Sequence, residues 1–312
     1  MKIVFYSPGK KVQPWLDSLA ANLPSADIWA WSPQSADQQA DYAVVWAPPS
    51  ELFAPQQKLK AVFNIGAGAD RVLRIPHVDG LLRGIPVVRL NDAGMSVQMA
   101  EYVCHALFRH TREFAEYEAH QRDNKWKTLP ALDRANWQVG VMGLGAIGAR
   151  VAGAVAGFDF PVKGWSRTPK ELANITTYAG AEQFDAFLAD TRVLVCVLPL
   201  TPATEGILNA RTLGRLKPKS ILINVARGEH LVEDDLLAML ATGHLAGATL
   251  DVFREEPLPS GHEFWDHPKI TVTPHIAAIT LVEKSAAQIA QKIRAMESGQ
   301  PIEGVVDRSR GY

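Results

Sequence analysis

Short apolar runs alternate with longer amphipathic stretches along this 312-residue chain, and this alternation constrains the fold more than any other feature. A short apolar run suits a strand that is buried on both faces, and an amphipathic stretch between two such runs suits a helical crossover. The alternation therefore predicts an α/β fold with parallel sheets. At about 150 residues per domain, the length predicts two domains.

Ten apolar runs have the length and the flanking turns expected of strands. Four lie in the first part of the chain, at residues 2–6, 43–46, 61–65 and 87–89. A helical pattern from 96 to about 127 follows, with Phe114 on its apolar side. Six further strands are predicted at residues 137–142, 162–165, 193–197, 220–224, 248–251 and 271–273. Six strands with helical crossovers are typical of a doubly wound nucleotide-binding domain. The last helix is predicted over 282–298, because Gly299 and Pro301 follow it.

Composition excludes several classes of function. A net charge of −1 gives no basic excess for nucleic acid or for an anionic membrane surface. The most apolar region, 139–162, contains Arg150 and Asp159 and does not predict a membrane span. The only two cysteines, Cys104 and Cys196, are expected to be reduced core thiols. With a strand at the N-terminus in place of a cleavable signal pattern, we expect a cytoplasmic enzyme.

Residues 143–148 read Gly-Leu-Gly-Ala-Ile-Gly, directly after an apolar strand and before a helix-forming stretch. In this pattern Gly143 permits a tight turn, Gly145 lets the backbone approach a pyrophosphate, and Gly148 allows close packing of helix on strand. The helix N-terminus then receives the negative charge. A packing turn is the alternative, but the strand–turn–helix context favours a dinucleotide site. Its residues would be Gly143, Gly145, Ala146, Ile147 and Gly148.

The tip of the next strand indicates which dinucleotide is bound. An NAD site usually has an acidic residue there, which accepts hydrogen bonds from the ribose hydroxyls. Here the tip reads Ser166, Arg167, Thr168 and has no carboxylate. Arg167 can pair with a 2′-phosphate, and the two hydroxyls can donate hydrogen bonds. The alternative is a solvent-facing turn with an arginine in it. The missing acid favours NADPH, with NADH as the weaker cofactor.

Three ionisable residues follow successive strands near the end of the second set. They are Arg227, Glu256 and His275. Open α/β sheets bind ligands outside the carboxyl ends of their strands, so these residues are candidates for a common site. Arginine suits a substrate carboxylate, and histidine can transfer a proton near neutral pH. A carboxylate beside the histidine would favour its charged form and fix its orientation. Each residue taken alone also fits a surface or structural role.

Five ordered motifs make the chain resemble the D-2-hydroxyacid dehydrogenases over nearly its whole length. They lie at residues 143–148, 198–204, 224–228, 251–257 and 273–275. The closing residues 305–308 and 311–312 resemble the branch of that family whose members reduce glyoxylate and hydroxypyruvate. The resemblance implies two doubly wound parallel-sheet domains. A Rossmann dinucleotide-binding domain, 96–284, would be inserted into a flavodoxin-like substrate domain made of 1–95 and 285–312.

The resemblance also implies roles for individual residues. Arg227 would orient the substrate, His275 would be the acid and base, and Glu256 would support His275. Asp251 would contact the nicotinamide side of the cofactor, with Leu198 and Pro199 lining its cleft.

In the first part of the chain, the backbone N–H groups of Ala67 and Gly68 would face the substrate carboxylate, although a simple glycine turn is the alternative. Trp46 either narrows the substrate pocket or belongs to the core. The resemblance implies a homodimer, with the helix that begins near Ser96 as a candidate interface.

The expected activity is NADPH-dependent reduction of small 2-oxo acids, glyoxylate to glycolate and hydroxypyruvate to D-glycerate, with His275 as proton donor. One alternative is another dehydrogenase of the family, acting on phosphoglycerate, formate, D-lactate or a longer 2-oxo acid. The other is a dinucleotide-sensing binding protein on the same scaffold. Two departures from the family pattern are Ser166, which replaces the usual acid, and Ala69. No metal is expected, because the nine histidines are dispersed and the pair His262 and His267 suits a turn.

Overall fold

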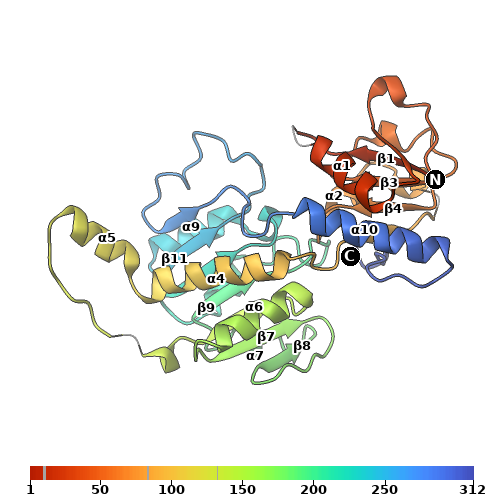
Figure 1. Ribbon diagram of the computed structural model, residues 1–312. Coiled ribbons are helices and arrows are strands. Elements are labelled where there is room, and N and C mark those ends of the chain that lie inside the picture. The colour runs from red at the N-terminus through yellow and green to blue at the C-terminus, as the bar shows by residue number, and fades with distance from the viewer. Residues whose placement is uncertain (10–11, 83, 132) are drawn as a thin grey trace. The chain divides into compact units, whose positions relative to one another are not determined.

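The chain divides into two compact units in a computed structural model that describes residues 1–9, 12–82, 84–131 and 133–312. We call Met1–Gly94 with Thr280–Tyr312 the terminal unit, and Met95–Ile279 the central unit. The chain therefore leaves the terminal unit once, after Gly94, and returns to it at Thr280 (Figure 1).

The terminal unit is built on a five-stranded parallel sheet in the order β2-β1-β3-β4-β5. Its strands are β1 (Lys2–Tyr6), β2 (Asp27–Ala30), β3 (Tyr42–Val45), β4 (Ala61–Asn64) and β5 (Val87–Arg89). Its helices are α1 (Val12–Asn22), α2 (Asp70–Leu73), α3 (Val78–Leu82) and α10 (Val282–Glu297). Helices α1 and α10 pack against each other, so the last long helix of the chain completes a layer that the first one begins (Figure 1).

The central unit is built on a seven-stranded parallel sheet in the order β12-β11-β10-β9-β6-β7-β8. Its strands are β6 (Val139–Met142), β7 (Val162–Ser166), β8 (Thr176–Ala179), β9 (Val193–Cys196), β10 (Ser220–Asn224), β11 (Leu245–Leu250) and β12 (Ile270–Val272). Its helices are α4 (Met95–Thr111), α5 (Phe114–Arg122), α6 (Ala146–Ala156), α7 (Phe184–Leu188), α8 (Ala210–Gly214) and α9 (Glu233–Ala241). Two apolar clusters cover opposite faces of this sheet, one with α4 and α6 and the other with α7, α8 and α9. The predicted α/β fold with two parallel sheets is confirmed.

All ten predicted strands form, but two further strands were not predicted. Both β2 and β8 are edge strands, and their residues are exposed or only half-buried. An edge strand lacks the continuous apolar run that marks a buried parallel strand. The expected count of six strands in the second set was therefore wrong, because the hydrophobic pattern does not detect β8.

The predicted long helix over 96–127 was also wrong in one respect, since it is two helices. Glu113 has φ 53°, which a right-handed helix cannot contain, and α4 ends before it while α5 begins after it. The side chain of Phe114 is consequently exposed and does not face the core. In Figure 1, α5 and the chain that follows it extend away from the sheet of the central unit.

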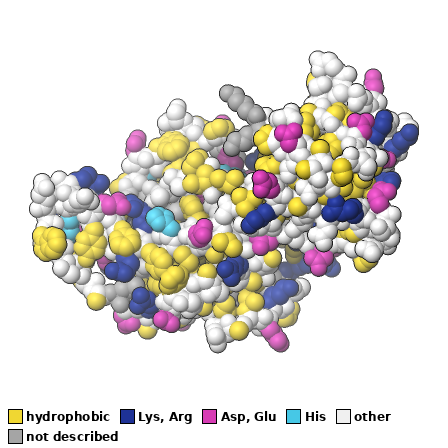
Figure 2. All heavy atoms as spheres, in the orientation of Figure 1, with side chains coloured by type: hydrophobic (Ala, Val, Ile, Leu, Met, Phe, Trp, Pro, Cys, Tyr) yellow, Lys and Arg dark blue, Asp and Glu magenta, His cyan; other side chains and the backbone are white. Residues whose placement is uncertain are grey.

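The surface of the central unit carries several large apolar side chains. Figure 2 shows hydrophobic side chains gathered over α4 and α5, and Trp126, just beyond α5, is fully exposed. Both cysteines are buried and unbridged. Within the described ranges of the chain, no helix has the length and apolar character needed to cross a bilayer.

Candidate active site

The glycine turn after β6 has the backbone geometry that its sequence predicts. Gly143 has φ 100°, and a Cβ there would lie 2.8 Å from the carbonyl oxygen of Val197. A Cβ at Gly148 would lie 1.7 Å from the carbonyl oxygen of Gly143, so only glycine lets α6 begin this close to β6. At Gly145, by contrast, no described atom lies within 4 Å of the Cβ position. The turn is therefore closed toward the protein and open where α6 begins.

An anion fits this open position. Gly145 is the N-cap of α6, so the unpaired N–H groups of the first helical turn and the positive end of the helix dipole face it. Ala146 is exposed there, while Ile147 packs partly on the core. The residues present therefore suit the pyrophosphate of a dinucleotide.

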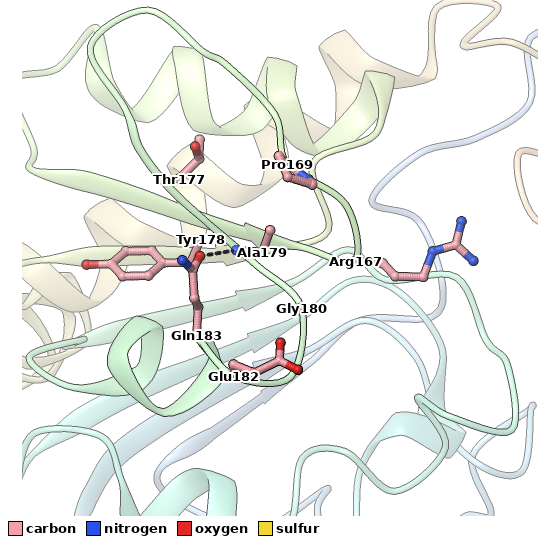
Figure 3. A pocket seen from close by; sticks show the side chains of 8 residues that line it. All are labelled: Arg167, Pro169, Thr177, Tyr178, Ala179, Gly180, Glu182 and Gln183. Atoms are coloured by element: carbon pink, nitrogen blue, oxygen red, sulfur yellow. Dashed lines mark hydrogen bonds between the residues drawn. The ribbon is translucent and has the colours of Figure 1, made fainter.

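The tip of β7 presents a cation and no acid. Ser166 is buried, and its hydroxyl donates a hydrogen bond of 2.7 Å to the carbonyl of Thr168, which fixes the turn. Arg167 is exposed, and in Figure 3 its guanidinium points away from Tyr178 and Gln183. The pocket beside this turn has a volume of about 510 Å³. It is lined by Arg167, Pro169, Thr177, Tyr178, Ala179, Gly180, Glu182 and Gln183.

The loop after β10 holds Arg227 through a buried histidine. The backbone N–H of Arg227 donates to Nδ1 of His230 at 3.2 Å, and Nε2 of His230 lies 3.3 Å from the carbonyl oxygen of Pro199. His230 is completely buried, and burial lowers its pKa. Nδ1 also lies 3.1 Å from the carbonyl oxygen of Arg227, so this nitrogen contacts the Arg227 backbone at two atoms. His230 thus links the Arg227 loop to the 198–204 segment, in which the side chain of Leu198 lies in the core.

Asp251 organises the loop that carries His275. Its Oδ1 accepts hydrogen bonds from the hydroxyl of Thr273 at 2.6 Å and from the N–H of Ile276 at 2.8 Å. Its Oδ2 accepts one from the N–H of Ala277 at 2.7 Å, and its carbonyl accepts one from the N–H of His275 at 2.9 Å. These bonds hold His275 at φ 56°, a left-handed conformation that is uncommon for histidine. The buried carboxylate therefore fixes the backbone on both sides of His275.

Tyr102 of α4 adds a further contact to this loop. Its hydroxyl oxygen lies 2.5 Å from the hydroxyl oxygen of Thr273. Burial raises the pKa of Tyr102 to about 12, a value that includes a lowering by the hydrogen bond with Thr273 and a smaller rise caused by the Asp251 carboxylate. Tyr102 therefore remains protonated near neutral pH and can donate a hydrogen bond to the loop.

Glu256 and His275 form a hydrogen-bonded pair in the central unit. Nδ1 of His275 lies 2.9 Å from Oε2 of Glu256, and Oε1 of Glu256 accepts a hydrogen bond from the N–H of Phe253 at 3.1 Å. About a third of the His275 side chain is exposed. A carboxylate on Nδ1 selects the tautomer with a proton on that atom. Nε2 is then the nitrogen that can exchange a proton with a bound molecule, and it gives one only when the ring carries both protons.

The loops that carry Arg227 and Glu256 touch each other. A Cβ at Gly228 would lie 1.8 Å from the carbonyl carbon of Phe253, so only glycine permits this approach. Nε of Arg254 also donates to the carbonyl of Leu231 at 3.2 Å. The strands before these loops, β10 and β11, are neighbours in the sheet, with β12 next to β11. The central unit thus brings the three predicted catalytic residues to adjacent carboxyl ends of one sheet.

The terminal unit holds the other predicted substrate residues, with Ala67 and Gly68 in a turn after β4 and Trp46 directly after β3. Asn64 is fully buried, and its Nδ2 donates to the carbonyls of Gly66 at 3.2 Å and Gly68 at 2.6 Å. The carbonyl and N–H of one planar trans peptide point in opposite directions. Holding the carbonyl of Gly66 therefore aims the N–H of Ala67 away from Asn64. Trp46, which follows β3, is half-buried.

Sequence reasoning missed His230 and Asn64, and it gave Asp251 only a cofactor contact. Each is a buried polar group at or just after the carboxyl end of a strand. A polar residue that ends an otherwise apolar strand was the available signal for Asn64 and Asp251, whereas no pattern marked His230. Among the described residues, no group of three or more histidine, cysteine, aspartate or glutamate side chains could hold a metal ion.

Fold and site together define a dinucleotide-binding α/β protein whose central sheet carries both the glycine turn and a histidine–carboxylate pair after carboxyl ends of its strands. Comparison with known proteins gives the family. Residues 104–277 match the family described as D-isomer specific 2-hydroxyacid dehydrogenase, NAD binding domain. The chain belongs to the D-isomer specific 2-hydroxyacid dehydrogenase family.

Similar proteins match along the whole chain. The glyoxylate/hydroxypyruvate reductase A of Yersinia enterocolitica is 46% identical over 314 residues, with 100% of both chains covered. A solved 2-hydroxyacid dehydrogenase from Xanthobacter autotrophicus, in complex with NADPH and MES, is 39% identical with a TM-score of 0.93, covering 100% of this chain and 99% of that one. An NADPH-dependent glyoxylate/hydroxypyruvate reductase from Sinorhizobium meliloti, solved with NADP and sulfate, is 36% identical with the same TM-score and coverage.

Proposed function

We propose that this chain reduces glyoxylate to glycolate and hydroxypyruvate to D-glycerate with NADPH, and uses NADH less well. The observation that carries the proposal is the His275–Glu256 pair at 2.9 Å, on a loop fixed by the buried Asp251 carboxylate. The full-length similarity to reductases of these two substrates supports the choice of substrate.

The two units would have different tasks. The central unit, which overlaps the predicted range 96–284, would bind the dinucleotide, and the terminal unit, which overlaps the predicted ranges 1–95 and 285–312, would bind the substrate. The glycine turn after β6 and the matched dinucleotide-binding family region support the first assignment. The Asn64-supported turn, with its outward N–H group at Ala67, supports the second.

The cofactor would be held by the open turn at Gly145 and by the N-terminus of α6, with Asp251 and Pro199 toward its nicotinamide end. When bound, it supplies the hydride. Arg167 would pair with the 2′-phosphate, with Ser166 and Thr168 shaping the turn that presents it. The absence of an acid at this position removes the usual partner of a free 2′-hydroxyl and so disfavours NADH.

The substrate steps fall to a few side chains. The planar guanidinium of Arg227 would bind the carboxylate and orient the 2-oxo group. Nε2 of His275 would donate the proton that the developing alkoxide needs, and the Glu256 carboxylate would stabilise the imidazolium before that transfer. In the terminal unit, the N–H groups of Ala67 and Gly68 would bind a carboxylate oxygen, and Trp46 would limit the space beside it.

We also propose that the protein is a cytoplasmic homodimer. The exposed apolar side chains on α4, α5 and the segment after α5, among them Val97, Phe114, Tyr117 and Trp126, would be covered by a second copy. Light scattering with wild-type protein and a Trp126→Ser variant tests this, because a monomeric wild type would contradict it.

The test of the main proposal is the loss of NADPH absorbance with glyoxylate and with hydroxypyruvate, run beside NADH. Rapid turnover with NADPH and slow turnover with NADH is the expected result. A preference for NADH would contradict the cofactor assignment but would leave the assigned reaction unchanged. Tight NADPH binding without turnover of any 2-oxo acid would instead favour a dinucleotide-sensing protein.

A further inference from the structure

A side chain at Gly66 would meet a different kind of obstacle from one at Gly143 or Gly148. At Gly143 and Gly148 the obstacle is backbone, whereas at Gly66 it is a side chain. A Cβ at Gly66 would lie 2.6 Å from Cζ3 and 3.3 Å from Cη2 of Trp46. Carbon atoms in ordinary contact are about 3.5–4.0 Å apart, so a methyl group does not fit beneath the ring. Its φ lies outside the left-handed region, so the backbone does not require glycine. The indole of Trp46 is the nearest obstacle to a side chain here, and Nδ2 of Asn64, 3.3 Å from the Cβ position, is the next.

The close approach of Gly66 and Trp46 also shows where the indole lies. The backbone N–H of Trp46 donates to the carbonyl of Tyr6 in β1 at 2.8 Å, and the backbone N–H of Ile65, directly after β4, donates to the carbonyl of Val45 at 3.0 Å. The ring therefore reaches from the end of β3 to the turn that follows β4. Consecutive Cα atoms are about 3.8 Å apart, so the N–H groups of Ala67 and Gly68 lie within roughly two such steps of the ring edge.

We propose that Gly66 determines substrate size, by seating the Trp46 indole against the turn so that only 2-oxo acids with a small group on C2 are accepted. The inference rests on the proposed function, in which this turn binds the substrate carboxylate. The group on C2 of a 2-oxo acid is two bonds from the carboxylate carbon. An indole beside the N–H groups that bind the carboxylate would therefore contact the group on C2 before any more distant part of the substrate. A hydrogen, as in glyoxylate, or a hydroxymethyl, as in hydroxypyruvate, is small enough.

The magnitude follows from what an apolar wall can discriminate. One methylene in a hydrophobic pocket changes kcat/KM by roughly 10–200-fold. Adding a Cβ at position 66 pushes the ring off the turn by about 1 Å, which restores an ordinary carbon–carbon contact. The space over the turn then widens, and a longer 2-oxo acid gains relative to a short one.

The experiment is a double-mutant cycle read as a ratio of kcat/KM values, 2-oxopentanoate over glyoxylate, with NADPH saturating. Gly66→Ala is expected to raise this ratio about tenfold, and Trp46→Ala to raise it at least as much. In the Trp46→Ala background, Gly66→Ala should change the ratio by less than about twofold, because its effect needs the indole. Gly80→Ala is the matched control: it is the same change in the same unit, and its Cβ would enter open space.

Different outcomes overturn different claims. A ratio that Gly66→Ala leaves unchanged overturns the inference, and so does an equal change with and without Trp46, since the turn itself would then be responsible. If Gly66→Ala does not fold, as judged by circular dichroism and NADPH binding, Trp46→Phe replaces it and must raise the ratio. A wild type that reduces glyoxylate but fails these tests overturns this inference alone. A wild type that reduces no 2-oxo acid overturns the proposed function and the inference together.

Discussion

The carboxyl edges of the two sheets carry different kinds of candidate site. At the carboxyl edge of the central sheet, charged side chains are held by buried polar anchors, with Asp251 beneath the His275 loop and His230 beneath the Arg227 loop. At the edge of the terminal sheet, the anchor is the Asn64 amide, and what it holds is backbone. Side chains that exchange protons need a fixed position and a fixed ring orientation, whereas backbone donors need only a direction. Under the proposed function, the chemical step would belong to the central unit and the choice of substrate to the terminal unit.

The largest test of that division is His275→Gln. Glutamine can occupy the same space but cannot transfer a proton, so kcat should fall by about 10²–10⁴-fold. The affinity for NADPH, measured by fluorescence titration, should stay within about twofold, because the glycine turn is untouched. Turnover close to that of the wild type would remove His275 from the chemical step and break the comparison.

Acid should weaken the central unit through two histidines, the half-buried His110 and the buried His230. Burial lowers the pKa of His110 to about 4, with a further contribution from the charge of Arg109, and burial also lowers the pKa of His230. Below pH 6.5 the unfolded chain then binds protons that the folded chain does not, so the free energy of unfolding falls as the pH falls toward 4. For His110 this amounts to about 2–3 kcal/mol at pH 4.5.

Urea denaturation at pH 7 and at pH 4.5 measures this loss. A His110→Gln variant should lose about 2–3 kcal/mol less than the wild type over that interval. Equal losses in the two proteins would mean that His110 is protonated in the folded state.

Arg167→Ala sharpens the comparison within the central unit, because it should affect cofactor choice alone. Removing an exposed arginine from a phosphate should raise the Kd for NADPH about tenfold. The Kd for NADH, measured in the same titration, should hardly change, because NADH has no 2′-phosphate. An equal weakening of both would show that Arg167 acts through folding.

The smallest expected effect comes from Asn64→Ala in the terminal unit. Loss of the two hydrogen bonds to the carbonyls of Gly66 and Gly68 should leave the Ala67 N–H less well aimed and raise KM for glyoxylate about threefold to tenfold. Steady-state kinetics should show kcat nearly unchanged, since no group that transfers a proton is altered. A fall in kcat with KM preserved would place Asn64 in the chemical step and would erase the distinction between the two units.

The sequence predicted those parts of the fold that depend on apolar runs. The buried strands β5 and β10 occur at the residues expected, because a strand covered on both faces is apolar throughout. Strand β8 was invisible because one edge of it faces solvent, and the break at Glu113 was invisible because the charged residues around it are also good helix formers.

The features of the candidate site also differ in whether the sequence could predict them. Glycines whose Cβ would collide with backbone, such as Gly148, could be read from a motif, because the constraint is local in sequence. The link between Arg227 and Pro199 through His230, and the contact between Gly66 and Trp46, join residues that are distant in the chain. Such contacts depend on how strands are ordered in the sheet, and no short pattern encodes that order.

The packing of α10 on α1 affects when the terminal unit can be completed during synthesis. Ala286, Ile289 and Ile293 of α10 are buried in the terminal unit, yet they are made only after the whole central unit. About 190 residues separate Gly94 from α10, so at roughly 5–20 residues per second the ribosome needs about 10–40 s to supply that helix. During that interval the five strands of the terminal unit and α1 are present, but α10, against which α1 packs, is not. The unit that begins first is the one completed last.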